Sequence, residues 1–231
     1  MPTFTSQKSD TTKYASPKII PMLTPSAIRS NWLQLCEDWS VPMATAEACW
    51  QPIEAAYTAP DRHYHNLDHL QGMIFHFHLY EDLLEEPESV LFSIFYHDLV
   101  YDVARPDNEA QSAALAAEVL PWLGRSQADI ERCQQFILAT QAHAPTEDVD
   151  TQYLLDFDLA ILGADPIRYE AYTRQIRAEY ARFPDEIYRP GRRQVLQRFL
   201  ARPTIFQTPE FQDQYEAEAR ENLFAEFQSL A

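Results

Sequence analysis

Glycine is scarce in this chain of 231 residues, with only four glycines against 16 prolines. No Asn-Gly or Asp-Gly hairpin pair occurs, which argues against a β-sandwich and against an α/β fold with a Gly-rich phosphate loop. The three cysteines form no CxxC pair, so a disulfide framework or a zinc ribbon is not expected and a reducing compartment is favoured. No apolar run approaches the ~18 residues of a membrane span, and the N-terminus lacks the apolar core of a signal peptide. We therefore expect a cytoplasmic protein with no membrane partner.

Lysine is missing after position 18, and every later cation is an arginine. The formal net charge of −17 argues against a nucleic-acid polymer as partner, because phosphate-backbone binding needs clustered cations. The charge is uneven, however. Residues 166 to 202 hold nine arginines and four acids, so this segment is net positive within an acidic chain.

The apolar residues recur with the period of an α-helix along most of the chain. One stripe at i, i+3, i+4 and i+7 consists of Trp32, Leu35, Cys36 and Trp39. Helix starts are indicated by the Ser126 to Asp129 capping-box spacing and by the pairs Asp165-Pro166 and Thr208-Pro209. We predict a flexible tail over residues 1–23 and a single all-α domain over 24–231, a bundle of about eight to ten helices. The sequence does not indicate an oligomeric state.

Histidine is concentrated in one short stretch, since five of the seven histidines lie between positions 63 and 78. Another, His97, is followed directly by Asp98 in a predicted apolar helix over residues 90–102. Burying a carboxylate there costs several kcal/mol unless it is paired or bound to a metal. The same argument applies to Asp156 and Asp158, which are embedded among leucines. Imidazole and carboxylate together favour Mn, Fe, Zn, Co or Ni, with Mg also open.

The ordered motifs resemble those of the HD superfamily of metal-dependent phosphohydrolases, and more narrowly a bacterial family of predicted HD phosphohydrolases. The resemblance covers roughly residues 28–230. It rests on RHYHNLDH (62–69), YHDLVYD (96–102), DNEAQSA (107–113), DFDLAILG (156–163), IRAEY (176–180), GRRQVLQRFL (191–200) and AREN (219–222). It implies an HD-domain, phosphodiesterase-like helical bundle that uses a divalent metal ion to hydrolyse a small phosphorylated substrate.

The resemblance also implies a ligand set and a set of catalytic and substrate-binding residues. The implied metal ligands are His65, His97, Asp98 and Asp158, with Asp156 and His143 as alternatives. Metal-bound water would attack phosphorus, with Asp102, Glu109 and Asp98 as the candidate catalytic acids. The net charge would repel a phosphate ester, so guanidinium groups are expected to bind it, and His69 could serve the substrate or a second metal. The substrate-binding candidates are Arg62, His69, Arg177, Arg192 and Arg193.

Three function classes remain open on the sequence alone. The first is a phosphohydrolase acting on a small phosphorylated metabolite, most plausibly a nucleotide. The second is a metal-containing module that binds a nucleotide without turning it over, which is suggested by Tyr101 at an offset where some HD enzymes carry an acid. A helical scaffold with a purely stabilising metal is a third reading.

Overall fold

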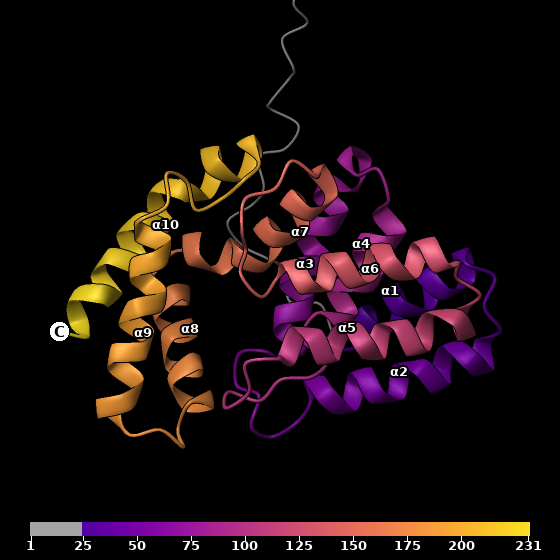
Figure 1. Ribbon diagram of the computed structural model, residues 1–231, viewed down its shortest axis with the longest axis horizontal. Coiled ribbons are helices and arrows are strands. Elements are labelled where there is room, and N and C mark those ends of the chain that lie inside the picture. Colours follow the sequence, from indigo (N-terminus) through magenta and orange to yellow (C-terminus); the bar gives the residue numbers. More distant parts are fainter. Residues whose placement is uncertain (1–24) are drawn as a thin grey trace, which may run out of the picture.

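The computed structural model describes residues 25–231, and the predicted tail over 1–23 lies outside them. Within this range the chain is all-α, with ten α-helices, three short 3-10 segments and no strand (Figure 1). The predicted bundle of about eight to ten helices is confirmed. The helices are α1 (Pro25–Asp38), α2 (Met43–Tyr57), α3 (Leu67–Tyr80), α4 (Pro87–Tyr96), α5 (Asn108–Val119), α6 (Gln127–Ala139), α7 (Val149–Leu159), α8 (Pro166–Glu179), α9 (Asp185–Leu200) and α10 (Pro209–Ser229). The 3-10 segments are η2 (Glu81–Leu83), η3 (Leu120–Leu123) and η4 (Ala160–Gly163).

Local capping chemistry fixes three helix starts where the sequence predicts them. Ser126 and Asp129 form a reciprocal capping box at the start of α6. The Asp165 side chain accepts hydrogen bonds from the first backbone N–H groups of α8, and the Thr208 side chain accepts one from the N–H of Phe211 in α10. These side chains satisfy donors that a helix N-terminus otherwise leaves without partners.

One predicted element differs: α4 ends at Tyr96 rather than continuing to residue 102. His97 is the C-cap, and its Nδ1 lies 2.9 Å from the carbonyl oxygen of Ile94. The chain beyond it is held by the guanidinium of Arg62, which donates to the carbonyls of Asp98 and Leu99. These hydrogen bonds join residues more than 30 positions apart in sequence, so no local sequence pattern predicts where the helix ends.

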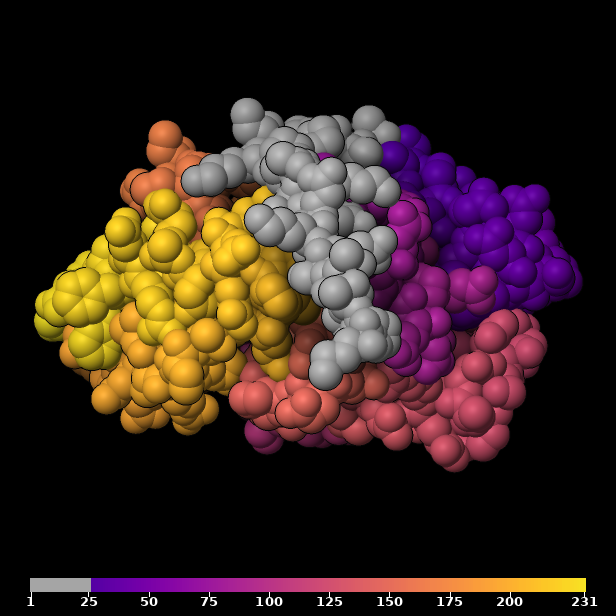
Figure 2. Space-filling view, turned by 90° about the horizontal axis from the view of Figure 1, so that it is seen from above, coloured from indigo at the N-terminus to yellow at the C-terminus, as the bar shows by residue number. Residues whose placement is uncertain are grey.

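The helices form two groups, one at each end of the molecule (Figure 1). Helices α1 to α6 form the larger group, and α8, α9 and α10 form the smaller one, with α7 and η4 between them. The space-filling view agrees, with the C-terminal helices at one end and α1 and α2 at the other (Figure 2). In residues 25–231 no helix is long and apolar enough to cross a membrane.

A glycine permits the close approach of η4 to α10. A Cβ atom at Gly163 would lie 2.6 Å from the Cβ and 2.7 Å from the carbonyl oxygen of Tyr215. Because such distances are too short for any larger residue, Gly163 lets the two elements meet. Their contact fixes α7 and its carboxylates relative to the C-terminal helices.

Candidate metal centre

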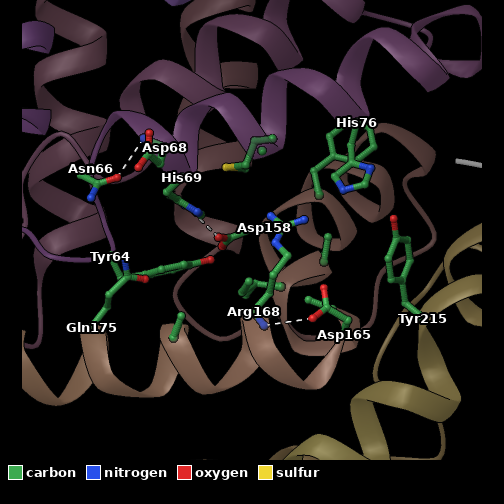
Figure 3. A pocket seen from close by; sticks show the side chains of 18 residues that line it. Tyr64, Asn66, Asp68, His69, His76, Asp158, Asp165, Arg168, Gln175 and Tyr215 are labelled. Atoms are coloured by element: carbon green, nitrogen blue, oxygen red, sulfur yellow. Dashed lines mark hydrogen bonds and ion pairs between the residues drawn. The ribbon is translucent and has the colours of Figure 1, made fainter. Parts of the chain in front are cut away.

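Three side chains from different helices converge at one point in the bundle. His69 comes from α3, His97 from the end of α4, and Asp158 from α7. The Nε2 atoms of the two histidines are 3.1 Å apart, and Asp158 Oδ1 lies 3.3 Å from His69 Nε2 and 3.9 Å from His97 Nε2. Figure 3 shows His69 and Asp158 pointing toward each other at one cavity. Donor atoms that all lie within 4.8 Å of one another could hold one metal ion.

Two further residues complete the cluster. Asp98 Oδ2 lies 3.1 Å from His97 Nε2 and 3.9 Å from Nε2 of both His65 and His69. His65 precedes α3, so it reaches the cluster from the loop rather than from a shared helix face with His69. All four ligands implied by the resemblance (His65, His97, Asp98 and Asp158) therefore lie together, and His69 joins them.

Hydrogen bonds to the distal ring nitrogens orient two of the imidazoles. The contact of His97 Nδ1 with the Ile94 carbonyl requires the Nδ1–H tautomer, which leaves Nε2 as the free donor atom. His65 Nδ1 likewise lies 2.7 Å from Glu179 Oε2. Both rings thus turn their Nε2 atoms toward Asp98.

The electrostatics of the cluster favour a cation. Burial alone would lower the pKa of His97, but the charges of Asp98 and Asp158 outweigh it and raise that pKa to about 9. Burial acts to raise the pKa of Asp98, yet His97 and His65 hold it well below its usual range. Asp158 is also held well below its usual pKa, against burial, by His143 and His69. Both carboxylates are therefore ionised at neutral pH.

Glu179 is a buried residue of this site that the sequence does not single out. It follows the arginine-rich stretch of α8, and its only sequence signal is its place in the IRAEY segment. Its Oε1 accepts hydrogen bonds from the backbone N–H groups of Tyr64 and His65, and its Oε2 contacts His65 Nδ1 and the Tyr101 hydroxyl. Burial acts to raise the pKa of Glu179, but these partners lower it to about 2. Glu179 therefore holds His65 in place.

The two alternative ligands have different roles. Asp156 is fully buried, and its carboxylate accepts hydrogen bonds from the backbone N–H groups of Gln207 and Thr208 and from the Thr208 hydroxyl. It thereby ties α7 to the start of α10, and no hydrogen bond or ion pair within residues 25–231 joins it to the clustered histidines. His143 lies beside the cluster, because its Nε2 is 2.9 Å from Asp158 Oδ2 and leaves Oδ1 for His69.

The predicted arginines are bound to protein groups. Arg62 is buried and donates to the carbonyls of His65, Asp98 and Leu99, so its contacts shape the backbone of the centre. The other three, Arg177, Arg192 and Arg193, bind groups within α8, α9 and α10. Their main partners are, in the same order, Asp185, Glu226 and the carbonyl of Phe227.

Two of the predicted catalytic acids lie outside the cluster. Asp102 is partly exposed, pairs with Arg182 at 3.0 Å and accepts a hydrogen bond from the N–H of Ala104. Glu109 lies in the first turn of α5. No hydrogen bond or ion pair within residues 25–231 joins either of them to the clustered histidines. Asp98 is the one predicted catalytic acid that contacts them.

Two cavities adjoin the centre. The first, of about 250 Å³, is lined by His69 and Asp158 and continues past Arg168 to His76 and Tyr215 (Figure 3). The second, of about 400 Å³, begins at His65 and is largely aromatic. Its aromatic lining consists of Tyr101, Tyr172, Tyr180, Phe183 and Tyr188.

Comparison of the whole chain with models of protein families, with curated proteins and with solved structures finds no match.

Proposed function

We propose that this protein is a metal-dependent phosphohydrolase of the HD type, acting on a small phosphorylated metabolite. The observation that carries the proposal is the convergence of His69, His97 and Asp158, joined by His65 and Asp98, at the wall of a cavity. A buried cluster of imidazoles and ionised carboxylates suits a divalent transition metal such as Mn, Fe, Zn, Co or Ni.

The donor set fits such an ion, because two imidazoles are oriented through Nδ1 and both carboxylates are ionised. When bound there, a divalent cation supplies charge neutralisation at a phosphoryl group and activation of a water molecule. The chain positions these donors through Glu179 and the Ile94 carbonyl. Of the expected catalytic acids, Asp98 is the one that contacts the clustered histidines, whereas Asp102 pairs with Arg182 and Glu109 lies in the first turn of α5.

The second cavity supports a nucleotide as the substrate. Its tyrosine and phenylalanine rings present flat apolar surfaces beside His65. Aromatic side chains bind nucleobases by stacking, which contributes about 1–3 kcal/mol per base. A base bound among these rings would place its phosphate near the cluster.

The test combines metal analysis with a hydrolysis screen. Purified protein is assayed for bound metal, and then for release of phosphate from nucleotides and sugar phosphates in the presence of Mn, Co, Ni, Zn or Mg. We expect His69→Gln and Asp98→Ala to lose both metal and turnover. His78→Gln is the matched control, because His78 is exposed on the same helix as His69 and bonds Glu81 and Asn31 instead. Full turnover by Asp98→Ala would refute the proposal.

A second candidate is a metal-containing module that binds a nucleotide without hydrolysing it. The separation of Asp102 and Glu109 from the cluster favours this reading, since two of three expected catalytic acids then have no part at the site. Stoichiometric nucleotide binding with no product after prolonged incubation with Mn would support it over the hydrolase.

A further inference from the structure

Arg168 lines the first cavity, although no sequence motif selects it. It lies on α8 and lines the cavity together with His69 and Asp158. Figure 3 shows its side chain rising from α8 into the cavity, in the direction of Asp158 and His76, while the hydrogen bond to Asp165 is made by its backbone N–H. The guanidinium therefore points into the same space that the metal centre borders.

The guanidinium of Arg168 has no hydrogen bond or ion pair within residues 25–231. Six other arginines of the positive segment are engaged with carboxylates or carbonyls. These are Arg174, Arg177, Arg182, Arg192, Arg193 and Arg202. A half-buried guanidinium loses part of its hydration, and an anion bound in the cavity would compensate for that loss.

The side chains around Arg168 in residues 25–231 do not supply that anion, so it would come from a bound ligand. Of the carboxylates that line the cavity, Asp158 is already engaged by His69 and His143, and Asp165 caps the start of α8. At the far end, His76 is buried, and its Nδ1 has no hydrogen-bond partner among the residues that the structure describes. Burial and the charge of Arg168 lower the pKa of His76 to about 3, so this end carries a neutral imidazole. Among residues 25–231, Arg168 is the arginine that lines this cavity.

We propose that Arg168 binds the phosphoryl group of the substrate in this cavity, with its guanidinium facing one side of the phosphate and the metal centre facing the other. Guanidinium suits the task because its N–H groups can bind two phosphate oxygens at once. The inference rests on the proposed function, and it identifies as the phosphate-binding residue an arginine other than Arg62, Arg177, Arg192 and Arg193.

The experiment measures binding of inorganic phosphate to the full chain by calorimetry, with and without Mn. Arg168→Gln should weaken phosphate binding by about 10- to 100-fold, the loss expected for a charge-assisted bidentate contact. The phosphate affinity of Arg168→Lys should lie between those of the wild type and Arg168→Gln, because lysine keeps the positive charge but cannot bind two phosphate oxygens with paired N–H groups. Arg174→Gln is the control, since Arg174 lies on the same helix and pairs with Glu170 at the surface.

Two further readouts separate the possible failures. Arg168→Gln should keep the wild-type metal content and melt within about 2 °C of the wild type, because the side chain has no partner to lose. Unchanged phosphate affinity in Arg168→Gln would overturn the inference. A wild-type chain that takes up no metal would overturn the proposed function instead. In that case the phosphate titration without Mn would still test whether Arg168 binds phosphate.

Discussion

The two aspartates of α7, only two positions apart, are expected to respond to substitution in opposite ways. Asp156→Ala removes the carboxylate that accepts from two Thr208 donors, at 2.7 Å each, and from the N–H of Gln207. Thr208 is 1% exposed, so its N–H and hydroxyl would be left buried. Each buried donor without a partner costs about 1–3 kcal/mol, which gives a loss of about 4 kcal/mol for the pair.

That loss converts into a measurable change in melting temperature. For a chain of this length, 1 kcal/mol corresponds to roughly 2–4 °C, so Asp156→Ala should melt about 8–16 °C below the wild type. Its metal content, measured on the folded protein at low temperature, should be unchanged. Asp158→Ala is the matched variant, and it should lose the metal because Asp158 Oδ1 lies within the histidine cluster.

The assay is a thermal melt followed by circular dichroism, with metal content determined on the same samples. The assignment of roles would be refuted if Asp156→Ala melted within about 2 °C of the wild type. It would also be refuted if Asp156→Ala lost the metal while Asp158→Ala retained it.

Three more predictions concern other positions. Glu179→Gln should weaken Mn binding about 10- to 100-fold in a calorimetric titration, because His65 loses its charged partner; equal affinity would contradict this role. The pKa of His76 is lowered to about 3, so between pH 7.5 and 4.5 the unfolded state takes up a proton that the folded state does not. Over that range the wild type should lose about 2–3 kcal/mol more unfolding free energy than His76→Phe, as measured by urea denaturation at each pH; parallel curves would contradict it. Gly163→Ala should destabilise the fold by about 1–3 kcal/mol, since its Cβ would clash with Tyr215, and an unchanged melting temperature would refute that contact.

Helix starts could be predicted from the sequence where their cause is local. The Ser126 capping box and the Asp165-Pro166 start involve residues within a few positions of one another, and the structure has them as expected. The predicted end of α4 lies several residues beyond the observed one. The observed end depends on Arg62, which is more than 30 residues away in sequence and binds the carbonyls of Asp98 and Leu99. Local patterns carry no information on such contacts.

The same distinction between local and long-range causes applies to the candidate site. Asp98 and Asp158 stand out in the sequence because a carboxylate among apolar residues conflicts with burial, and both lie in the cluster. Asp156 gives the same signal but serves as a helix anchor, so the conflict alone does not distinguish a ligand from a structural acid. The contact of Glu179 with His65 spans 114 positions, and no spacing rule reveals it.

Which arginine faces the cavity could not be predicted either. The candidates lie in the same arginine-rich stretch of sequence: Arg168, Arg177, Arg192 and Arg193. Only their contacts in the folded chain distinguish them. Three of them are bound to groups of α9 and α10 or of the loop between α8 and α9. The fourth, Arg168, points into the cavity (Figure 3).

We propose that this bundle holds a catalytic metal ion, and the direct test is the metal content of the purified chain measured together with phosphate release. We expect at least one divalent ion per wild-type chain, metal-dependent release of phosphate, and loss of both in His69→Gln but not in His78→Gln. A wild-type chain that binds no divalent metal, or a His69→Gln variant that keeps both metal and turnover, would contradict it.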